Sequence, residues 1–324
     1  MLQYAIRRIL IGFVTLVGVT MIVFALINAI PGDPAALQSD VQDPEMSARM
    51  AEMLRKHFEL DKPLHERYVS WVGKMARGDF GTSFQDGRPV GAKIVARLAP
   101  TMSIATLSVI LGMLAAIPIG LVQGVRHNGW FDRLSGVALY MMFAVPSYVA
   151  AVLLIYTVGV QWDLLPFRGL KSDGYEGLSA LGKAQDLIAH GTLITFCYTY
   201  ASVAFDSRFV RGTLLEVLRQ DYIRTARAKG VAEHVVVLKH AFRNTFIPLL
   251  TRLGSLVPAL ISGSVILEVI FNWPGLGRLF FEGILARDYP VMMASCLISS
   301  VLTLAGILLA DLLYAVADPR IRYD

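Results

Sequence analysis

The sequence predicts an all-α, polytopic membrane protein with six transmembrane helices and both termini in the cytoplasm. Hydrophobic residues make up 55% of the 324 residues and charged residues only 17%, whereas an average soluble domain has about 25% charged residues. The uncharged residues are gathered in long blocks, and the positive charges lie mainly on alternate connections between those blocks. This pattern excludes soluble globular, fibrous and disordered proteins.

The uncharged blocks define the predicted transmembrane helices. A helix needs about 20 apolar residues to cross the hydrocarbon core of a bilayer, and five blocks without Asp, Glu, Lys or Arg have about that length. A further apolar segment is interrupted by Arg252, and the last helix continues past Asp311. The six predicted spans cover residues 9–30, 99–125, 134–162, 187–205, 246–267 and 289–317. The whole chain, 1–324, is thus predicted to form a single transmembrane domain.

Particular residues refine the first three spans. Arg7 and Arg8 precede the first block, which is longer than the roughly 7–15 residues in the apolar core of a cleavable signal peptide. We therefore expect a retained signal anchor. Pro118 and Pro146 are expected to kink the second and third spans, because proline removes a hydrogen bond from the helix.

The distribution of Lys and Arg sets the predicted orientation. The N-terminal residues, the connections 126–133 and 206–245 and the tail after residue 317 together hold fourteen Lys and Arg, against five in the opposite short loops. Short cytoplasmic loops of membrane proteins are enriched in positive charge, so both termini are predicted to be cytoplasmic. The net charge of +5 then reflects topology in a lipid bilayer, and no nucleic-acid partner is expected.

Two connections are long enough to carry function. Residues 31–98 are predicted to lie outside the cytoplasm and to contain two amphipathic helices, 46–58 and 64–75. These helices either cap the bundle or lie in the membrane interface, or they form a docking surface for an external partner. The aligned apolar residues of the second helix are Leu64, Tyr68, Trp71, Val72 and Met75. Residues 206–245 are the main cytoplasmic connection.

Motifs for enzymatic or metal chemistry are absent from the sequence. It contains no HExxH pair, no GxSxG turn and no Cys/His cluster with zinc spacing, so no catalytic residue, metal site or cofactor is expected. Residues 177–183 match the first part of a P-loop, but Ala184 replaces the Ser or Thr that would bind Mg²⁺. Cys197 and Cys296 lie in apolar blocks and are expected to be packing residues. The spans hold few ionisable groups, so energy for transport would have to come from elsewhere.

A short basic helix is predicted within the cytoplasmic connection. Asp221 is a favourable N-cap residue, and the segment 221–229 mixes apolar residues with three basic ones. Gly230 readily adopts the left-handed conformation that ends a helix. A second helix, 231–242, is predicted to lead back to the membrane. From composition alone this is a basic helical projection with an apolar face to bury, or else a loop whose basic residues serve only topology.

The cytoplasmic connection also resembles a known family. The segment 221–230 reads DYIRTARAKG and is followed by HAFRNTFIPLL. These residues are similar to the EAA loop of permease subunits in binding-protein-dependent ABC importers, above all those of the dipeptide and oligopeptide branch. Further motifs of that family occur in order along the whole chain: Arg7-Arg8, Pro31-Gly32-Asp33-Pro34, Gly78-Asp79-Phe80-Gly81, Asn272-Trp273-Pro274-Gly275-Leu276-Gly277, Arg287-Asp288-Tyr289-Pro290 and Asp318-Pro319-Arg320-Ile321-Arg322.

The resemblance implies an ABC importer permease fold and a transport subunit of the bacterial cytoplasmic (inner) membrane that is not itself an enzyme. It implies a homologous second permease subunit, which supplies the other half of the pathway, and two cytoplasmic ATPase subunits, which bind ATP and Mg²⁺. An extracytoplasmic solute-binding protein would deliver substrate to the outer face. The turn 274–277 and the connection 31–98 are candidate landing surfaces for that protein.

In this family the EAA loop contains a coupling helix that docks on the ATPase subunit. The resemblance assigns the ATPase-coupling role to Asp221, Arg224, Thr225, Ala226, Arg227, Ala228, Lys229 and Gly230. Arg224 stands where the family consensus has Glu, so the contacts of that Glu are not carried over. Ala226 is expected at the contact, because a small residue lets the helix and the ATPase surface approach closely.

Peptides are the substrates that the resemblance implies, with dipeptides and oligopeptides as the class. A permease of the same architecture for nickel chelates or glutathione is the alternative. A gated channel is disfavoured by the coupling helix, and an intramembrane enzyme is disfavoured by the missing catalytic residues.

Two charged residues lie within the predicted spans, and they suggest an ion pair. Arg252 and Asp311 are each about six residues from the same membrane face, so pairing across adjacent helices would relieve the cost of burying both charges. Alternatively, Arg252 extends to the lipid headgroups while Asp311 faces water. Asp206 is a further candidate partner for Arg252.

Overall fold

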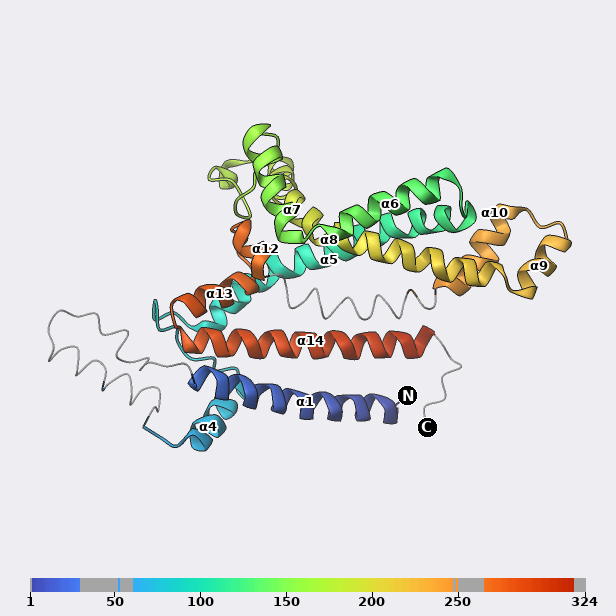
Figure 1. Ribbon diagram of the computed structural model, residues 1–324. Helices are drawn as coiled ribbons and strands as arrows, with labels where there is room; N and C mark the ends of the chain where they lie inside the picture. Colours follow the sequence, from blue (N-terminus) through green and yellow to red (C-terminus); the bar gives the residue numbers. More distant parts are fainter. Residues whose placement is uncertain (1, 30–51, 53–60, 247–248, 250–264, 318–324) are drawn as a thin grey trace.

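The computed structural model describes residues 2–29, 52, 61–246, 249 and 265–317, and Figure 1 shows how they are arranged. Regular structure in these residues is helical, apart from one isolated β-bridge between Thr82 and Pro89. The all-α class is therefore confirmed. The elements are α1 (Leu2–Asn28), α4 (Leu64–Ala76), α5 (Val90–Val125), α6 (Trp130–Ala144), α7 (Ser147–Leu154), η1 (Ile155–Gln161), η2 (Tyr175–Gly177), α8 (Ala180–Leu218), α9 (Asp221–Ala228), α10 (Glu233–Val235), η3 (Val236–Ala241), α12 (Val265–Ile270), α13 (Leu276–Leu285) and α14 (Tyr289–Ala317).

Four of the described helices, α1, α5, α8 and α14, contain segments long and apolar enough to cross a membrane. The α6 helix and the α7–η1 helix make a fifth crossing if they are counted together, although they meet at an angle of 93°. Most of the predicted span 246–267 lies outside the described residues, so the count of six spans stays a prediction.

The bend between α6 and α7 is located at Val145 and Pro146. Pro146 has no N–H to continue the helix, and a proline disfavours helical geometry in the residue before it. Val145 is accordingly extended, with φ −85° and ψ 120°, and its carbonyl accepts a hydrogen bond from the Tyr200 hydroxyl of α8. The sequence predicted a kink within one continuous span, whereas the structure has a nearly right-angled break. Pro118, by contrast, lies inside the continuous helix α5.

The helices α5 and α8 form the central pair of the fold. Small residues recur every four positions on one face of α5, at Gly112, Ala116, Gly120 and Gly124, and all four are buried. A Cβ atom at Gly120 would lie 2.5 Å from the backbone of α8, and one at Gly124 would lie 2.7 Å from an α8 side chain. Small residues at this spacing let two helices approach closely in a membrane. A larger side chain at either glycine would push the central pair apart.

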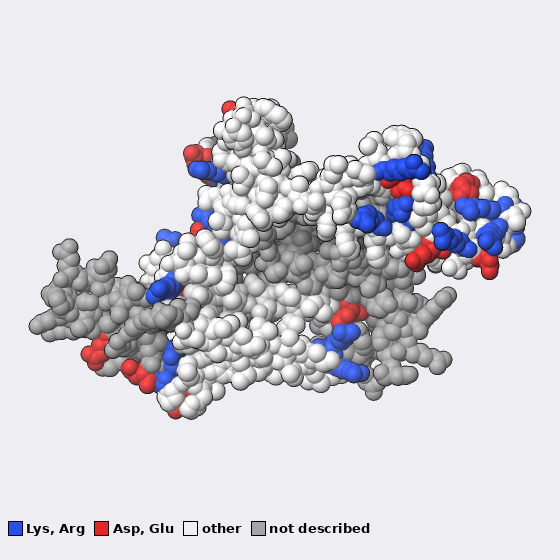
Figure 2. Space-filling model, viewed as in Figure 1, with Lys and Arg blue, Asp and Glu red and all other residues white. Residues whose placement is uncertain are grey.

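The two ends of the molecule differ in their charge and in the helices that they contain. Helices α1 and α14 lie side by side, and the start of α1 and the end of α14 lie at the same end of the molecule as α9 and α10 (Figure 1). Lys and Arg gather over α9 and α10 in Figure 2. We refer to this as the inner end, and to the opposite end, with α4 and α13, as the outer end. That both termini are cytoplasmic stays a prediction.

The predicted helix 64–75 is confirmed as α4, and it packs across the outer half of α1. Trp71 is buried, and its ring centroid lies 5.6 Å from that of Phe24. The Tyr68 hydroxyl lies 2.9 Å from the hydroxyl of Thr20. The apolar face of α4 therefore covers α1. The other predicted helix of this connection, 46–58, falls almost wholly outside the described residues.

Candidate functional site

The helix predicted to couple to an ATPase is α9, at the inner end of the molecule. Its N-cap residue is Gln220, whose side chain makes no capping hydrogen bond. The prediction of Asp221 as the N-cap is therefore wrong by one position, since Asp221 is the first residue of the helix. A carboxylate there still faces the positive end of the helix dipole. It also lies 3.8 Å from Arg224, in a pair that is largely exposed.

The end of α9 forms a Schellman motif around Gly230. Gly230 has a φ of +74°, which glycine adopts without the steric cost that a Cβ atom would bring. Its N–H donates to the carbonyl of Arg227 at 2.9 Å, and the N–H of Val231 donates to the carbonyl of Ala226 at 3.3 Å. These two bonds, with the hydrophobic contact of the residue after the glycine, are the defining features of this motif. The predicted role of Gly230 as a helix terminator is thus confirmed.

The apolar face of α9 is buried against the chain itself. Ile223 and Ala226 pack in a cluster with Leu214 of α8, Val236 and Ala241. Ala226 is only 8% exposed, so the packing of α9 on the chain itself already explains a small residue at this position. A contact of Ala226 with the ATPase surface stays a prediction.

The face of α9 that remains available is polar and mostly basic. Arg224, Thr225, Arg227, Ala228 and Lys229 are all exposed. This face is therefore the part of the predicted coupling site that another protein can reach, and it presents positive charge with one small residue.

Two polar contacts fix α9 on the helices that follow it. The guanidinium of Arg227 donates to both carboxylate oxygens of Glu233, at 3.1 and 2.6 Å. This bond lowers the pKa of Glu233 and raises that of Arg227. On the other side, the Asn244 amide donates to the Tyr222 hydroxyl at 2.6 Å. The orientation of α9 is thus set by side chains on both of its edges.

The cluster beneath α9 also reaches the central helix pair. Leu121 of α5 and Val217 of α8 pack against the same buried residues. Since α5 and α8 contact each other through the small-residue face of α5, a displacement of α9 bears directly on the inner ends of both helices.

At the outer end, Glu268 of α12 is a buried carboxylate, 1% exposed. It accepts a hydrogen bond from the Thr101 hydroxyl of α5 at 2.9 Å and one from the backbone N–H of Arg278 at 2.9 Å. The Thr101 oxygen in turn accepts from the N–H of Leu276 at 2.8 Å. Glu268 and Thr101 therefore satisfy the free N–H groups at the start of α13 and join that helix to α5 and α12.

The turn 272–277 is folded around this carboxylate. A Cβ atom at Gly275 would lie 2.2 Å from an oxygen of Glu268, so a side chain there would displace this carboxylate. Trp273 is buried, and its indole N–H donates to the Pro100 carbonyl at 3.2 Å. Residues 274–277 are mostly buried in this chain, which corrects the expectation that they offer a landing surface. The motif instead builds the junction of α5, α12 and α13.

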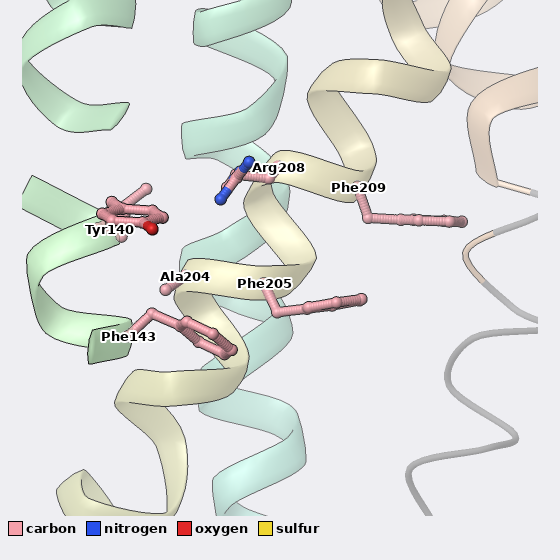
Figure 3. A pocket seen from close by; sticks show the side chains of 7 residues that line it. Tyr140, Phe143, Ala204, Phe205, Arg208 and Phe209 are labelled. Carbon is pink, nitrogen blue, oxygen red and sulfur yellow. The ribbon is translucent and has the colours of Figure 1, made fainter. Parts of the chain in front are cut away.

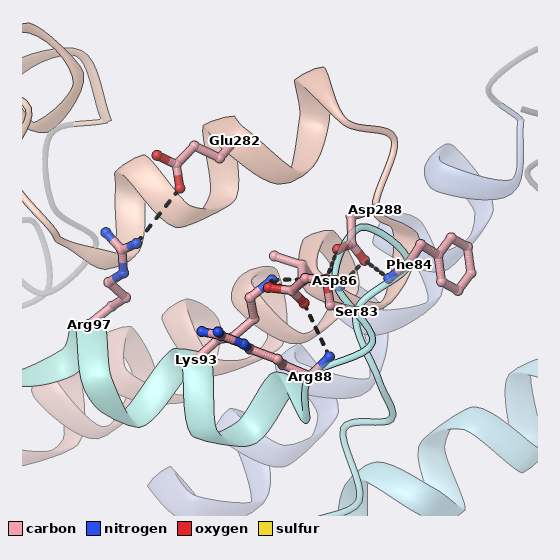
Figure 4. A network of polar contacts seen from close by, with 9 residues as sticks. Ser83, Phe84, Asp86, Arg88, Lys93, Arg97, Glu282 and Asp288 are labelled. Carbon is pink, nitrogen blue, oxygen red and sulfur yellow. Dashed lines mark hydrogen bonds and ion pairs between the residues drawn. The ribbon is translucent and has the colours of Figure 1, made fainter. Parts of the chain in front are cut away.

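A second buried carboxylate, Asp288, joins the outer connection to the start of α14 (Figure 4). It accepts a hydrogen bond from the Ser83 hydroxyl and one from the N–H of Phe84 at 3.1 Å. Lys93 of α5 donates to Ser83 at 2.9 Å and to Asp86 at 3.0 Å. The bond from Lys93 is the main reason that the pKa of Asp86 falls to about 2.

The motifs 78–81, 272–277 and 287–290 thus meet at one end of the molecule. Phe80 of the first motif packs on a cluster that includes Leu276 of the second and Val291, which follows the third. Sequence reasoning gave no role to Glu268 or to Thr101. The available signal was the recurrence of glycine in 272–277, which indicates a place where the backbone approaches another group closely.

The predicted ion pair between Arg252 and Asp311 stays a prediction, because Arg252 lies outside the described residues. Asp311 itself lies 3.0 Å from Arg8 of α1. Asp206 is fully buried in α8. Among the described residues, no group of three or more His, Cys, Asp or Glu is placed to hold a metal ion.

Comparison with known proteins identifies the family. Residues 95–323 match the family described as "Binding-protein-dependent transport system inner membrane component", and residues 1–105 match its N-terminal counterpart. The chain is 39% identical over 324 residues to the oligopeptide transport system permease protein AppB of Bacillus subtilis (strain 168), and all of both chains is covered. It is 36% identical over 323 residues to the glutathione transport system permease protein GsiC of Escherichia coli (strain K12), again with complete coverage.

A solved structure agrees in fold. The structure entitled "Inward facing conformations of the MetNI methionine ABC transporter" superposes with a TM-score of 0.57, at 17% identity, over 71% of this chain and 99% of the other. With both family models matched from one end of the chain to the other, the chain belongs to the binding-protein-dependent transport system inner membrane components, and it is a multi-pass permease subunit of an ABC importer in the bacterial inner membrane.

Proposed function

We propose that this chain is a permease subunit for small peptides and that α9 is the helix through which ATPase subunits drive it. The observation that supports this proposal best is the two-sided character of α9. Its apolar face is anchored on the inner ends of α5 and α8, while its basic face is exposed at the end of the molecule where the positive charges gather. A helix held in this way can be displaced by a docked protein while it stays packed on the rest of the chain.

The proposed coupling runs from α9 into the central pair. When the ATPase subunits close on ATP and displace α9, the bidentate pair of Arg227 and Glu233 keeps the helix attached to α10. The apolar cluster then transmits the displacement to Leu214 of α8 and Leu121 of α5. Since interfaces of packed helices have discrete arrangements, such a push would switch the pathway between its outward- and inward-facing states.

The remaining partners follow from the family. A homologous second permease subunit would complete the pathway, two ATPase subunits would hold ATP and Mg²⁺, and a solute-binding protein would dock at the outer end. No cofactor is assigned to this chain. The six spans, 9–30 to 289–317, with 31–98 outside and 206–245 inside, form the proposed topology.

Small peptides are the proposed substrate class. The relative from B. subtilis is named an oligopeptide permease and that from E. coli a glutathione permease. Glutathione is itself a modified tripeptide, so both names point to substrates with a peptide backbone. The chain has the higher sequence identity to the oligopeptide permease, which favours unmodified peptides, with glutathione as the second candidate.

The coupling role is tested by charge reversal on the exposed face of α9. Lys229→Glu should reduce copurification of the ATPase subunits with the permease complex by about tenfold or more, because it reverses a positive charge on the face proposed to dock, and a mismatched charge in a docked interface is costly. The matched control is Arg126→Glu, an exposed arginine at the same end but outside α9. Unchanged copurification with Lys229→Glu, or equal losses in both variants, would contradict the proposal.

The substrate class is tested in proteoliposomes that contain the complete importer and its binding protein. Labelled dipeptides, pentapeptides, glutathione and a nickel chelate are offered in the presence and absence of ATP. We expect ATP-dependent uptake of the unmodified peptides and competition between them. Uptake of glutathione or nickel chelate alone would replace the peptide assignment, and uptake without ATP would favour a channel.

A further inference from the structure

An open, aromatic groove lies between α6 and α8, on the inner half of the molecule (Figure 3). Its volume is about 410 Å³. The residues that line it are Leu139, Tyr140 and Phe143 of α6 and Ala204, Phe205, Arg208 and Phe209 of α8. Tyr140 and Phe143 are 62% and 53% exposed, so the groove opens to the outside of this chain.

Arg208 is the one charged residue of this lining. Its guanidinium carbon lies 5.9 Å from the centre of the Tyr140 ring, within the range of a cation–π interaction. In the part of the chain that the structure describes, no carboxylate lies within ion-pair distance of it. Arg211, one turn further along α8, differs in this respect, because it donates to both oxygens of Asp132 at 2.6 and 2.8 Å. Arg208 therefore has no carboxylate partner among the described residues, and its positive charge is available to an anion.

The depth of Arg208 along α8 indicates which kind of anion can reach it. Asp132, the partner of Arg211, lies in the first turn of α6. Arg208 is three residues from Arg211 and so about 4.5 Å deeper along the helix. Trp130, at the start of α6, is 72% exposed, as is common for tryptophan at the boundary between membrane and water. In the proposed topology, the flexible side chain of Arg208 can extend toward the headgroups of the inner leaflet.

The surface beside the groove is apolar. Val137 and Met141 of α6 are 53% and 64% exposed and lie within one turn of Tyr140 in the same helix. Next to one guanidinium there is thus a strip of exposed apolar side chains that runs toward the middle of the membrane. This combination fits a molecule with a negative headgroup and a hydrocarbon tail.

We propose that the groove binds an anionic phospholipid of the inner leaflet. The phosphate accepts hydrogen bonds from Arg208, and an acyl chain lies along Tyr140, Phe143 and Met141. Basic residues placed between helices on the cytoplasmic side of a membrane protein favour such headgroups, and a charge-assisted bond to phosphate satisfies a guanidinium that lacks a carboxylate. This site rests on the proposed topology, in which the inner end faces the cytoplasm, but it does not depend on the proposed ATPase coupling.

The proposal is tested by counting lipids on the purified transporter. The complex is exchanged into nanodiscs with equal parts of phosphatidylglycerol and phosphatidylethanolamine, transferred to detergent and examined by native mass spectrometry. Wild type should retain phosphatidylglycerol in preference to phosphatidylethanolamine, and Arg208→Gln should lower that retention about fivefold, the effect of one basic residue near an anionic surface. Arg208→Lys, which keeps the charge, should retain most of the lipid.

Arg133→Gln is the matched control, because Arg133 is also exposed on α6 but does not line the groove. It should leave the retained phosphatidylglycerol unchanged. If Arg208→Gln does not insert, Tyr140→Ala removes a wall of the groove without changing charge and should also lower retention. Equal retention in wild type and Arg208→Gln, or equal losses in the Arg208 and Arg133 variants, would overturn the proposal. Loss of the second permease subunit with Arg208→Gln, at unchanged lipid retention, would assign the groove to a protein partner instead.

Discussion

The carboxylate of Asp311 in α14 lies 3.0 Å from the guanidinium of Arg8 in α1. An acidic residue in the last helix is thus accommodated by a basic residue that precedes the first apolar block. Both side chains are partly exposed, at 22% and 41%, and the pair joins the first part of α1 to the last part of α14. This contact joins the two ends of the chain.

The pair of Arg8 and Asp311 should behave as one unit in a double-mutant cycle. We expect Arg8→Ala and Asp311→Ala each to lower thermal stability in detergent, with a coupling energy of about 0.5–1 kcal/mol, as is usual for partly exposed ion pairs. Arg7→Ala is the control. Coupling between Arg252→Ala and Asp311→Ala, together with additive effects of the Arg8 and Asp311 variants, would favour the pair that the sequence predicted.

Gly230→Val should loosen the end of α9 while the protein still inserts. Valine at a φ of +74° costs about 1–2 kcal/mol, and hydrogen exchange of the Val231 amide should accelerate because its bond to Ala226 weakens. Gly230→Asn should have a smaller effect, since asparagine tolerates this conformation. A normal exchange rate and normal ATP-driven uptake in Gly230→Val would contradict the assignment.

Glu268→Ala should destabilise the outer end by about 1–3 kcal/mol, the cost of leaving buried hydrogen-bond donors without an acceptor. The donors are the Thr101 hydroxyl and the N–H of Arg278. Glu268→Gln keeps one acceptor oxygen and should cost less. Thermal unfolding in detergent measures both variants, and an unchanged melting temperature for Glu268→Ala would count against this role of the carboxylate.

Asp86 should make the outer connection sensitive to acid. Its folded-state pKa is about 2, below its ordinary value of 3.8, mainly because Lys93 donates a hydrogen bond to it. A lowered pKa stabilises the folded state at pH values above about 4, and this contribution is lost as the pH falls from about 4 toward 2. The hydrogen-exchange protection of residues 82–90, corrected for the intrinsic exchange rate at each pH, should therefore fall over that range. Asp86→Asn should remove the pH dependence, and a variant that keeps it would point to another group.

The sequence alone predicts the features that depend on nearby residues. The long uncharged blocks predicted the long apolar helices, and the amphipathic pattern predicted α4. The glycine at position 230 predicted the end of α9. The right-angled break at Pro146 was predicted only as a kink, because the size of a bend depends on what the freed carbonyl of Val145 meets, here Tyr200. That contact is set by tertiary packing.

The features that escaped prediction join distant parts of the chain. Glu268 and Thr101 are 167 positions apart, and Ser83 and Asp288 are 205 positions apart, so neither pair has a local pattern. The packing of Ala226 within the chain was not predicted either, because a small residue suits a contact with the chain's own η3 helix as well as a contact with a partner.

Exchanging the charges of Arg227 and Glu233 distinguishes a tie within the chain from a contact with the ATPase. Arg227→Glu removes the ion pair and places two negative side chains opposite each other, so it should detach α9 from α10 and reduce both uptake and copurification of the ATPase subunits. Glu233→Arg should act in the same direction. If Arg227 serves mainly to hold α9, the double variant restores the pair with reversed polarity and should recover most of the uptake. If Arg227 instead contacts the ATPase, the double variant should remain as defective as Arg227→Glu, and hydrogen exchange in α9 should return to normal without recovery of transport.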